Sequence, residues 1–485
     1  MLTNDNMTTQ TLSPEEIYLE QFIAQYCDRT KTSKQLTQAF RPTLADPRVS
    51  AGFSLPLKEM CYPIVAQKSL GSKIWDVDGN EYIDLIMGFG INLLGHNPPF
   101  IKQAIIEQLD RGIEIGVQTQ LAGEVAQLIS ELTGMERVTL SNTGTEAVMT
   151  AIRIARAATG RNKIAIFSGS YHGHSDATLV RRDLEVSSKS GDAVISLDIR
   201  EIDGSLQTVA KADGIPNSVV QDTLVLDYGN DDSLAVIKNH HSELAAVLVE
   251  PVQSCRPDLQ PKEFLQQLRQ LTAELGIVLI FDEMITGFRV DRGGAQAWFE
   301  VEADIATYGK IVGGGLPIGV IAGKAEYLDK IDGGMWHYGD RSSPQVKTTF
   351  FAGTYCKHPL SLAAAKAMLE YLKAQGNTLQ TQLGDRTTRF VGELNNCFAK
   401  FQLPIKMANF GSCFDAVLDS NSIPASESDG VNLGIDLLSY HLLHRGVLIR
   451  AGSGCISTAH TDRELNYAID AIEDSLKDLR QANLL

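Results

Sequence analysis

The stretch Gly276–Gly315, GIVLIFDEMITGFRVDRGGAQAWFEVEADIATYGKIVGGG, decides the fold. Its first part, Ile277–Phe281, is a continuous apolar run, which is typical of a strand buried on both faces of a parallel sheet. The run ends on two acids, Asp282 and Glu283. Open α/β sheets bind ligands at the carboxyl ends of their strands, and a buried charge there needs a cationic partner.

A single lysine, Lys310, follows Asp282 by 28 residues (310 − 282), about the length of one strand-to-strand crossover. A lysine in a glycine-rich, apolar setting can have its pKa lowered enough to act as an amine nucleophile and form a Schiff base. A protonated pyridine nitrogen would be the cation that Asp282 needs, which suggests pyridoxal phosphate. The residues alone leave a second interpretation open, in which Asp282 caps a helix and Lys310 is a solvated surface lysine.

The composition indicates a globular protein with one large and one smaller domain, since 44% of its 485 residues are hydrophobic and 21% are charged. A formal net charge of −16 argues against nucleic acid or an anionic membrane as a partner. No apolar run approaches the roughly 18 residues of a membrane span. The N-terminal MLTNDNMTTQ has no features of a secretion signal, so we expect a cytoplasmic protein.

The cysteines favour reduced thiols over disulfides or a zinc site. They are scattered, odd in number and never spaced as C-x-x-C. The seven are Cys27, Cys61, Cys255, Cys356, Cys397, Cys413 and Cys455.

Apolar strands alternate with helical patterns along the middle of the chain. KIAIF (Lys163–Phe167) and LAAVLVEPV (Leu244–Val252) join the strand before Asp282, and this alternation is typical of a parallel α/β sheet. Before them, Ser13-Pro14-Glu15-Glu16 forms a capping box that begins a helix in an N-terminal extension. The extension is either a docking element or a packed arm.

Other residues could complete a cofactor site. Asn142-Thr143-Gly144-Thr145 precedes an amphipathic helix, whose N-terminus can bind phosphate, although the same residues also cap helices without a ligand. Tyr171 and His172 follow a strand, where an aromatic ring can stack on a flat cofactor. Glu250 ends another buried strand at the same edge as Asp282. Arg450 suits a substrate carboxylate or a surface salt bridge equally well.

In combination these motifs resemble class III aminotransferases, in the branch of glutamate-1-semialdehyde aminomutase. The resemblance covers residues from about 50 to the C-terminus and rests on WDVDGNEYID, SNTGTEAVMTAIRIARAATGR, YHGH, VEPV, FDEMITGFR, GKIVGGGLPIG and ISTAHT. Within that branch, SAGFSLPLKEMCYPIV, GSKIWDVDGNEYIDLIMGFGINLLGH and TTFFAGTYCKHPLSLA look most like aminotransferase domains of hybrid polyketide and peptide synthases, of the mycosubtilin and microcystin kind.

The resemblance implies the α/β architecture of fold type I pyridoxal-phosphate-dependent transferases. We therefore expect a large domain with a mostly parallel, seven-stranded sheet and a smaller α+β domain assembled from both chain ends. The expected division is a helical extension over residues 1–50, the N-terminal part of the small domain over 51–110, the cofactor-binding large domain over 111–350, and the C-terminal part of the small domain over 351–485.

The resemblance also implies roles for individual residues. Lys310 would hold pyridoxal 5′-phosphate and shuttle the proton, and Asp282 would pair with the pyridine nitrogen. The remaining cofactor-binding residues would be Thr143, Gly144 and Thr145 at the phosphate, Tyr171 over the ring, His172, Glu250 and Thr354. Thr354, in AGT, matches a threonine that reaches the phosphate of the neighbouring subunit, which implies a homodimer with shared active sites.

Two differences from the aminomutases lie where substrate is expected. The aminomutases carry an acid shortly before the STAH motif, whereas this chain has Arg450-Ala451-Gly452-Ser453-Gly454. After AGT they have a Ser-Gly-Asn-Pro pattern, whereas this chain has Tyr355-Cys356-Lys357-His358-Pro359. Both differences argue against aminomutase activity.

We therefore expect an aminotransferase that moves an amino group from an amino acid donor, glutamate or glutamine, to a β-ketoacyl thioester on an acyl carrier protein. Arg450 is the candidate for the donor carboxylate. The alternatives are glutamate-1-semialdehyde 2,1-aminomutase and an ω-transaminase of free aldehydes or ketones. From a different class, a docking or scaffold protein on a degenerate transaminase fold is disfavoured because Lys310, Asp282 and Thr145 are intact.

Overall fold

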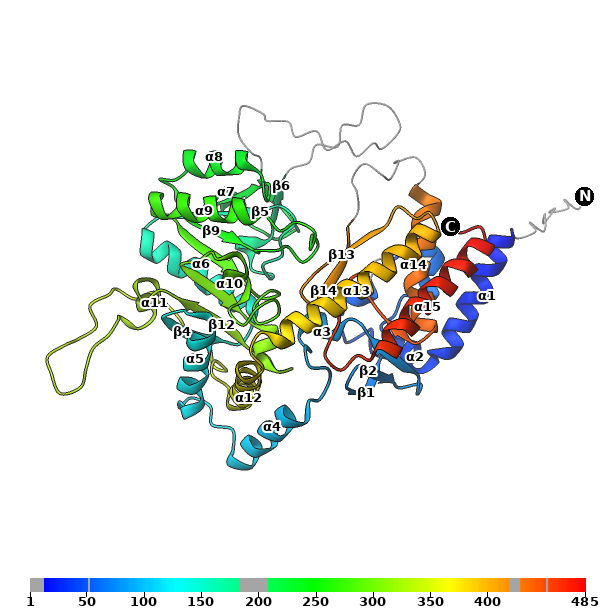
Figure 1. Ribbon diagram of the computed structural model, residues 1–485, viewed down its shortest axis with the longest axis horizontal. Coiled ribbons are helices and arrows are strands. Elements are labelled where there is room, and N and C mark those ends of the chain that lie inside the picture. The colour runs from blue at the N-terminus through cyan, green and yellow to red at the C-terminus, as the bar shows by residue number, and fades with distance from the viewer. Residues whose placement is uncertain (1–12, 51–52, 183–207, 418–427, 451) are drawn as a thin grey trace, which may run out of the picture.

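The structure is a computed structural model that describes residues 13–50, 53–182, 208–417, 428–450 and 452–485. Two lobes are visible in Figure 1, with the larger sheet and its helices on the left and the terminal helices on the right. No helix in the described part of the chain is long and apolar enough to cross a membrane.

A seven-stranded sheet forms the centre of the large domain. Strand β12 runs antiparallel to both of its neighbours, and the other neighbouring pairs are parallel. In spatial order the strands are β4 (Arg137–Ser141), β12 (Gly319–Gly323), β11 (Ile305–Tyr308), β10 (Val278–Asp282), β9 (Leu244–Val249), β5 (Lys163–Phe167) and β8 (Thr223–Leu226).

Both faces of this sheet are buried, as the apolar run before Asp282 predicts. Side chains alternate between the faces of a strand, so Val278 and Ile280 pack with one hydrophobic cluster while Leu279 and Phe281 pack with the other. Helix α6 (Gly144–Thr159) covers the first face with its apolar stripe. Helices α5 (Gln120–Thr133), α9 (Lys262–Leu275) and α12 (Pro359–Gln375) contribute to the second.

The small domain contains two sheets. In the four-stranded sheet, β15 (Val447–Leu448) pairs in parallel with β3 (Glu81–Asp84), so segments from both chain ends lie side by side. The antiparallel hairpin of β2 (Lys73–Asp76) with β3, followed outward by β1 (Ala66–Leu70), completes it. The other sheet contains β13 (Lys406–Phe410), β14 (Cys413–Val417) and β16 (Gly454–Cys455).

The N-terminal extension packs on the C-terminal helices. A capping box at Ser13 begins α1 (Pro14–Arg29), and Phe22 and Tyr26 of this helix are buried against Leu437 and Leu479. In Figure 1, α1 (blue) lies beside α15 (red). The remaining long helices of this region are α2 (Lys31–Phe40), α13 (Thr378–Lys400), α14 (Ser428–His444) and α15 (Asp462–Gln481).

The remaining elements are short or connect the domains. They are helices α3 (Met87–Gly90), α4 (Pro99–Arg111), α7 (Asn217–Gln221), α8 (Asp231–Asn239), α10 (Gly294–Phe299) and α11 (Ala325–Asp332), 3-10 helices η1 (Pro47–Val49), η2 (Leu55–Met60), η3 (Asp176–Thr178) and η4 (Lys310–Gly313), and the two-stranded sheet of β6 (Val180–Arg182) and β7 (Thr208–Ala210).

The prediction that every cysteine is a reduced thiol is wrong for one pair. The structure joins Cys413 to Cys455 in a disulfide across β14 and β16, 42 residues apart in sequence. The two residues are directly opposite each other in the antiparallel register, which places their side chains on the same face of the sheet. The other five cysteines are free thiols.

Candidate active site

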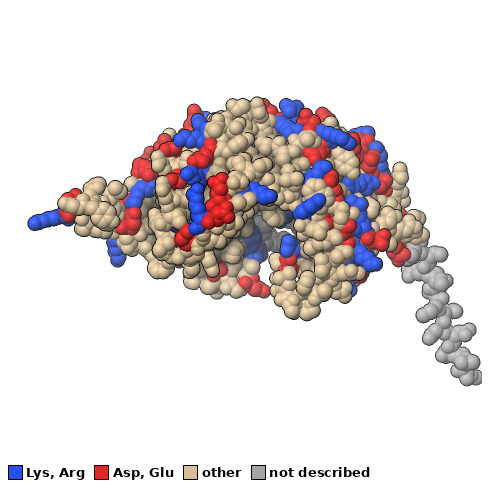
Figure 2. Space-filling view, turned by 90° about the horizontal axis from the view of Figure 1, so that it is seen from below, with Lys and Arg blue, Asp and Glu red and all other residues tan. Residues whose placement is uncertain are grey.

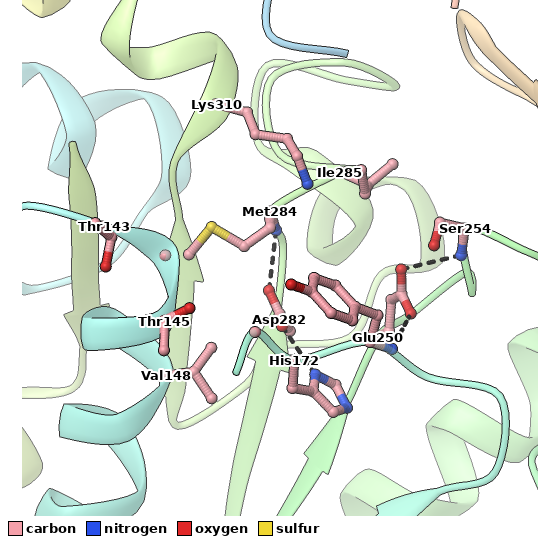
Figure 3. Close-up of a pocket in the computed structure, with 13 residues that line it drawn as sticks. Thr143, Thr145, Val148, His172, Glu250, Ser254, Asp282, Met284, Ile285 and Lys310 are labelled. Atoms are coloured by element: carbon pink, nitrogen blue, oxygen red, sulfur yellow. Dashed lines mark hydrogen bonds and ion pairs between the residues drawn. The ribbon is translucent and has the colours of Figure 1, made fainter. Parts of the chain in front are cut away.

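A cavity of ≈ 200 Å³ lies at the carboxyl edge of the large sheet. The residues that line it follow β4, β5, β9, β10 and β11, so separate crossovers bring them to one place (Figure 3). The lining residues are Thr143, Gly144, Thr145, Val148, Tyr171, His172, Gly173, Glu250, Ser254, Asp282, Met284, Ile285 and Lys310.

Asp282 is held rigidly at the bottom of this cavity. One carboxylate oxygen, Oδ2, lies 2.8 Å from Nδ1 of His172, and the other accepts the backbone N–H of Met284 at 3.1 Å and the Thr307 hydroxyl at 3.4 Å. Asp282 and His172 are each only 2% exposed. The interpretation of Asp282 as a helix cap is wrong, because the next helix, α10, begins only at Gly294.

Lys310 is the first residue of η4, and its amine points into the cavity (Figure 3). Burial lowers the pKa of the amine below its ordinary value, the Asp282 carboxylate partly opposes this effect, and the nearby Arg289 cation lowers the pKa further. The backbone φ of Lys310 is +47°, a left-handed conformation that costs a non-glycine residue about 1–3 kcal/mol. Lys310 is therefore not the solvated surface lysine of the second interpretation.

Glu250 joins two loops at the rim of the cavity. Its Oε2 accepts the backbone N–H of Tyr171 at 3.3 Å, and its Oε1 accepts that of Ser254 at 2.9 Å. Burial is the main cause that raises the pKa of this carboxyl to about 6. The carboxyl of Glu250 thus ties together the loops that carry Tyr171 and Ser254.

The N-terminus of α6 faces the cavity opposite Glu250. Thr143 is the N-cap residue, and its hydroxyl accepts the backbone N–H of Glu146 at 3.2 Å. The first N–H groups of a helix have no partner within the helix, so those of Gly144 and Thr145 are available for an anion. The Thr145 hydroxyl lies beside them and accepts the backbone N–H of His174 at 3.4 Å.

Close backbone contacts fix this turn. A Cβ atom added to Gly144 would meet Met284 Sδ at 2.7 Å, and one added to Gly319 would meet the Thr143 carbonyl oxygen at 2.1 Å. Gly319 of β12 therefore lets the helix N-terminus approach the sheet closely, and Gly144 lets it approach the Met284 side chain.

Gly319→Ala is expected to weaken binding of an anion at the N-terminus of α6 at least about tenfold, because the turn must shift. This corresponds to a loss of about 1.4 kcal/mol of binding free energy. Equilibrium dialysis of the bound group measures this effect. Gly123→Ala is the matched control, since a Cβ at Gly123 meets nothing within 4 Å. Equal retention by the two variants would contradict the role of the turn.

Two of the residues predicted from the sequence lie outside the cavity. Thr354 is exposed in the segment that precedes α12. Arg450 is also exposed, and its guanidinium carbon lies 5.3 Å from the centre of the Phe89 ring. The structure therefore brings together Lys310 with seven of the other predicted residues, but not with these two.

The sequence did not identify Arg289, whose cation lowers the pKa of the Lys310 amine although its side chain does not line the cavity. This side chain is 1% exposed, and it donates to the Ile285 carbonyl at 2.7 Å, to the Ser412 hydroxyl at 2.8 Å and to the Gly90 carbonyl. Burial lowers its pKa to about 10, and in the described residues it has no carboxylate partner. Because its acceptors are far apart in sequence, only the fold reveals its position.

The family model for "Aminotransferase class-III" matches residues 56–438, which is more than half of the chain. The chain is a class III aminotransferase. Class III aminotransferases use pyridoxal phosphate, so the enzyme is a pyridoxal-phosphate-dependent transaminase. The family and its solved transaminase relatives support an enzyme over the docking or scaffold protein on a degenerate transaminase fold.

The aminotransferase is 36% identical over 431 residues to the glutamate-1-semialdehyde 2,1-aminomutase of Alkaliphilus oremlandii, with 86% of this chain and 92% of the relative covered. Among solved structures it is similar to an omega-transaminase from Sphaerobacter thermophilus, with 29% identity, a TM-score of 0.78 and coverage of 92% and 98%. It is also similar to a β-phenylalanine aminotransferase from Variovorax paradoxus, with 26% identity, a TM-score of 0.76 and coverage of 96% and 98%. The expected fold type I architecture is confirmed.

The residues of the aminotransferase's cavity fit pyridoxal phosphate. The buried carboxylate of Asp282 can accept a hydrogen bond from a protonated ring nitrogen. The N-terminus of α6 can bind the phosphate, and the Lys310 amine lies in the same cavity. The close approach at Gly144 and Gly319 shapes the phosphate end.

Proposed function

We propose that the enzyme transfers an amino group from an amino acid donor to a β-ketoacyl thioester on an acyl carrier protein and releases a β-amino acyl product. The observation that supports amino transfer most directly is the convergence of Lys310, Asp282 and the N-terminus of α6 on one cavity. The carrier-bound acceptor is supported by the likeness to synthase aminotransferase domains and by the lack of an acid in Arg450–Gly454.

Each polar residue of the cavity has a role in this proposal. Lys310 would hold the cofactor through its amine, and the same amine would move the proton taken from the donor's α-carbon. The lowered pKa of Lys310 favours the neutral amine that can accept this proton. Asp282 keeps the ring nitrogen protonated, and His172, 2.8 Å away, orients Asp282. When bound, pyridoxal phosphate supplies an electron-withdrawing ring that stabilises negative charge beside the reacting carbon.

The other residues hold the cofactor in place. Thr143, Gly144 and Thr145 would bind its phosphate, and Tyr171 would cover its ring. Glu250 fixes the backbone of Tyr171 through the hydrogen bond described above. Arg450, whose planar fork lies against the Phe89 ring, would bind the donor carboxylate.

A second candidate is glutamate-1-semialdehyde 2,1-aminomutase, which the names of the curated relatives favour. It moves an amino group within one molecule and needs no separate acceptor. Against it stand the segments Arg450–Gly454 and Tyr355–Pro359, which differ from the aminomutase pattern. The β-phenylalanine aminotransferase described above is named for a β-amino acid, which supports chemistry at a β-carbon.

Absorbance of the bound cofactor distinguishes the candidates. The holoenzyme is mixed with single amino acids until its visible band is lost, excess donor is removed, and the enzyme is then challenged with a β-ketoacyl carrier protein. We expect glutamate or glutamine to bleach the band and the carrier-bound substrate to restore it, as in ping-pong kinetics. Restoration by glutamate-1-semialdehyde alone, without any acceptor, would instead assign the aminomutase reaction.

Class III aminotransferases are typically dimers, and we propose that two copies of this chain share their active sites. Thr354 supports this proposal, because it is exposed and outside its own chain's cavity. Thr354→Ala is expected to weaken cofactor retention about tenfold, as loss of a hydrogen bond to a charged phosphate does.

A mixing experiment tests whether Thr354 acts across the interface. A heterodimer of Thr354→Ala with Lys310→Ala contains one doubly impaired site and one intact site if Thr354 serves the partner. When equal amounts of the two chains pair at random, about half of the dimers are mixed and each of these has one intact site of two. At limiting cofactor the mixture is then expected to regain about a quarter of the wild-type activity. No gain over Thr354→Ala alone would show that Thr354 does not serve the partner.

A further inference from the structure

A second cavity, of ≈ 700 Å³, lies in the small domain and shares no residue with the cavity at Lys310. The end of α1, the β2–β3 hairpin, the turn between α14 and β15, and the start of α15 meet around it. Its lining consists of Arg29, Lys73, Glu81, Ile83, Arg445, Gly446, Thr461, Arg463, Glu464 and Tyr467.

The lining of this cavity is basic, although the whole chain carries a net charge of −16. Two of its four cations are paired: Lys73 lies 2.5 Å from Glu81, and Arg445 lies 2.5 Å from Asp478. The other two, Arg29 and Arg463, form no ion pair with any residue that the structure describes. Cations gathered without counter-charges repel each other and attract an anion.

The acids of the lining do not neutralise these two arginines. Glu464 accepts the Ser72 hydroxyl at 2.8 Å and the Thr461 backbone N–H at 2.8 Å, as part of the capping box of α15. Arg29 has a buried Nε atom without a hydrogen-bond partner among the described residues. A buried donor without a partner is unfavourable, and an anionic ligand would supply the missing acceptor.

We propose that this cavity binds a small organic phosphate, with the phosphate group between Arg29 and Arg463. The planar fork of arginine matches phosphate oxygens in pairs, and two arginines suit a doubly charged group. The volume exceeds that of a bare ion and lies within the range of about 300–1,000 Å³ that small-molecule sites occupy. Tyr467, 48% exposed at the rim, supplies a ring for the organic part of the ligand.

The site exists only while the N-terminal extension is docked, because Arg29 ends α1 and the other cations belong to the small domain. Strand β3 runs from Glu81 towards the turn at Phe89, and its parallel partner β15 leads to Arg450. The extension thus contributes a residue to a binding site, in addition to packing as an arm.

Calorimetric titration of the holoenzyme tests the proposal. The enzyme is loaded with pyridoxal phosphate beforehand, so that the phosphate site at the N-terminus of α6 is already occupied. The probes are ADP, which represents free nucleotides, and 4′-phosphopantetheine, which represents the arm of a carrier protein. We expect at least one of them to bind with a Kd below about 1 mM and to bind more weakly at high salt. Binding of only one probe identifies which source of phosphate the cavity accepts.

The variant Arg29→Gln/Arg463→Gln is expected to lower the affinity for the probe at least about tenfold. Arg29→Lys keeps the charge but loses the planar fork, so its affinity is expected to lie between those of the double variant and the wild type. Arg389→Gln, an exposed arginine on α13, is the matched control and should bind as the wild type does. An unchanged rate of the half-reaction with the amino acid donor, which needs no carrier protein, shows that the double variant is folded. Absence of binding by both probes, or equal affinity in the double variant, would overturn the proposal.

Discussion

Replacing Lys310 by alanine is expected to lower kcat at least about 10⁴-fold, because one change removes both the covalent attachment and the proton carrier. The remaining contacts of the cavity should still bind the cofactor, since the N-terminus of α6 and Asp282 are untouched. Borohydride reduction followed by mass spectrometry should therefore find the cofactor attached to the wild-type chain and not to the variant. Steady-state turnover measures the loss of kcat.

Lys238→Ala is the matched control for this experiment, since Lys238 is exposed on α8 and lies outside the cavity. It should retain wild-type turnover and covalent attachment. Full activity in Lys310→Ala, or covalent cofactor on another lysine of the wild type, would show that Lys310 is not the attachment site.

Asp282→Asn is expected to lower kcat about 10²–10⁴-fold with little loss of folding stability. The amide has the size of the carboxylate and can still approach His172, but it carries no charge to hold a proton on the ring nitrogen. The reacting carbon then loses most of the stabilisation that a protonated ring provides. Single-turnover reaction with the donor measures the chemical step directly.

For Asp282→Asn, the control is Asp385→Asn at an exposed position of α13. A cofactor analogue whose ring nitrogen carries a permanent positive charge should restore part of the activity lost in Asp282→Asn. If the variant kept wild-type rates, the Asp282 charge would have no role in catalysis.

The large sheet could be predicted because its signal is local. Five consecutive apolar residues, Ile277–Phe281, require burial on both faces, and the acid that follows marks the ligand-binding edge. The same reasoning predicted that Glu250, at the end of β9, and the N-terminus of α6, after β4, lie at this edge of the sheet. In each case the strand, the turn and the polar residue are adjacent in sequence, so their relative position follows from the strand itself.

The features that the sequence did not predict depend on contacts between distant segments. Cys413 and Cys455 pair because β14 and β16 share one register, and nothing in the spacing of the cysteines reveals that register. Arg289 is buried against carbonyl or hydroxyl groups of three separate segments, and the sequence around Arg289 does not show which segments these are. The cavity around Arg29 and Arg463 likewise needs both ends of the chain.

The mass of the acyl group on the carrier protein tests the central claim most directly. The holoenzyme is incubated with amino-¹⁵N-labelled glutamate, with amide-¹⁵N-labelled or amino-¹⁵N-labelled glutamine in a parallel reaction, and with a β-ketoacyl carrier protein. The account predicts that the keto oxygen is replaced by a labelled amino group at the β-carbon, and that Lys310→Ala forms none of this product. An unchanged acyl group, together with isomerisation of glutamate-1-semialdehyde by the same preparation, would contradict it.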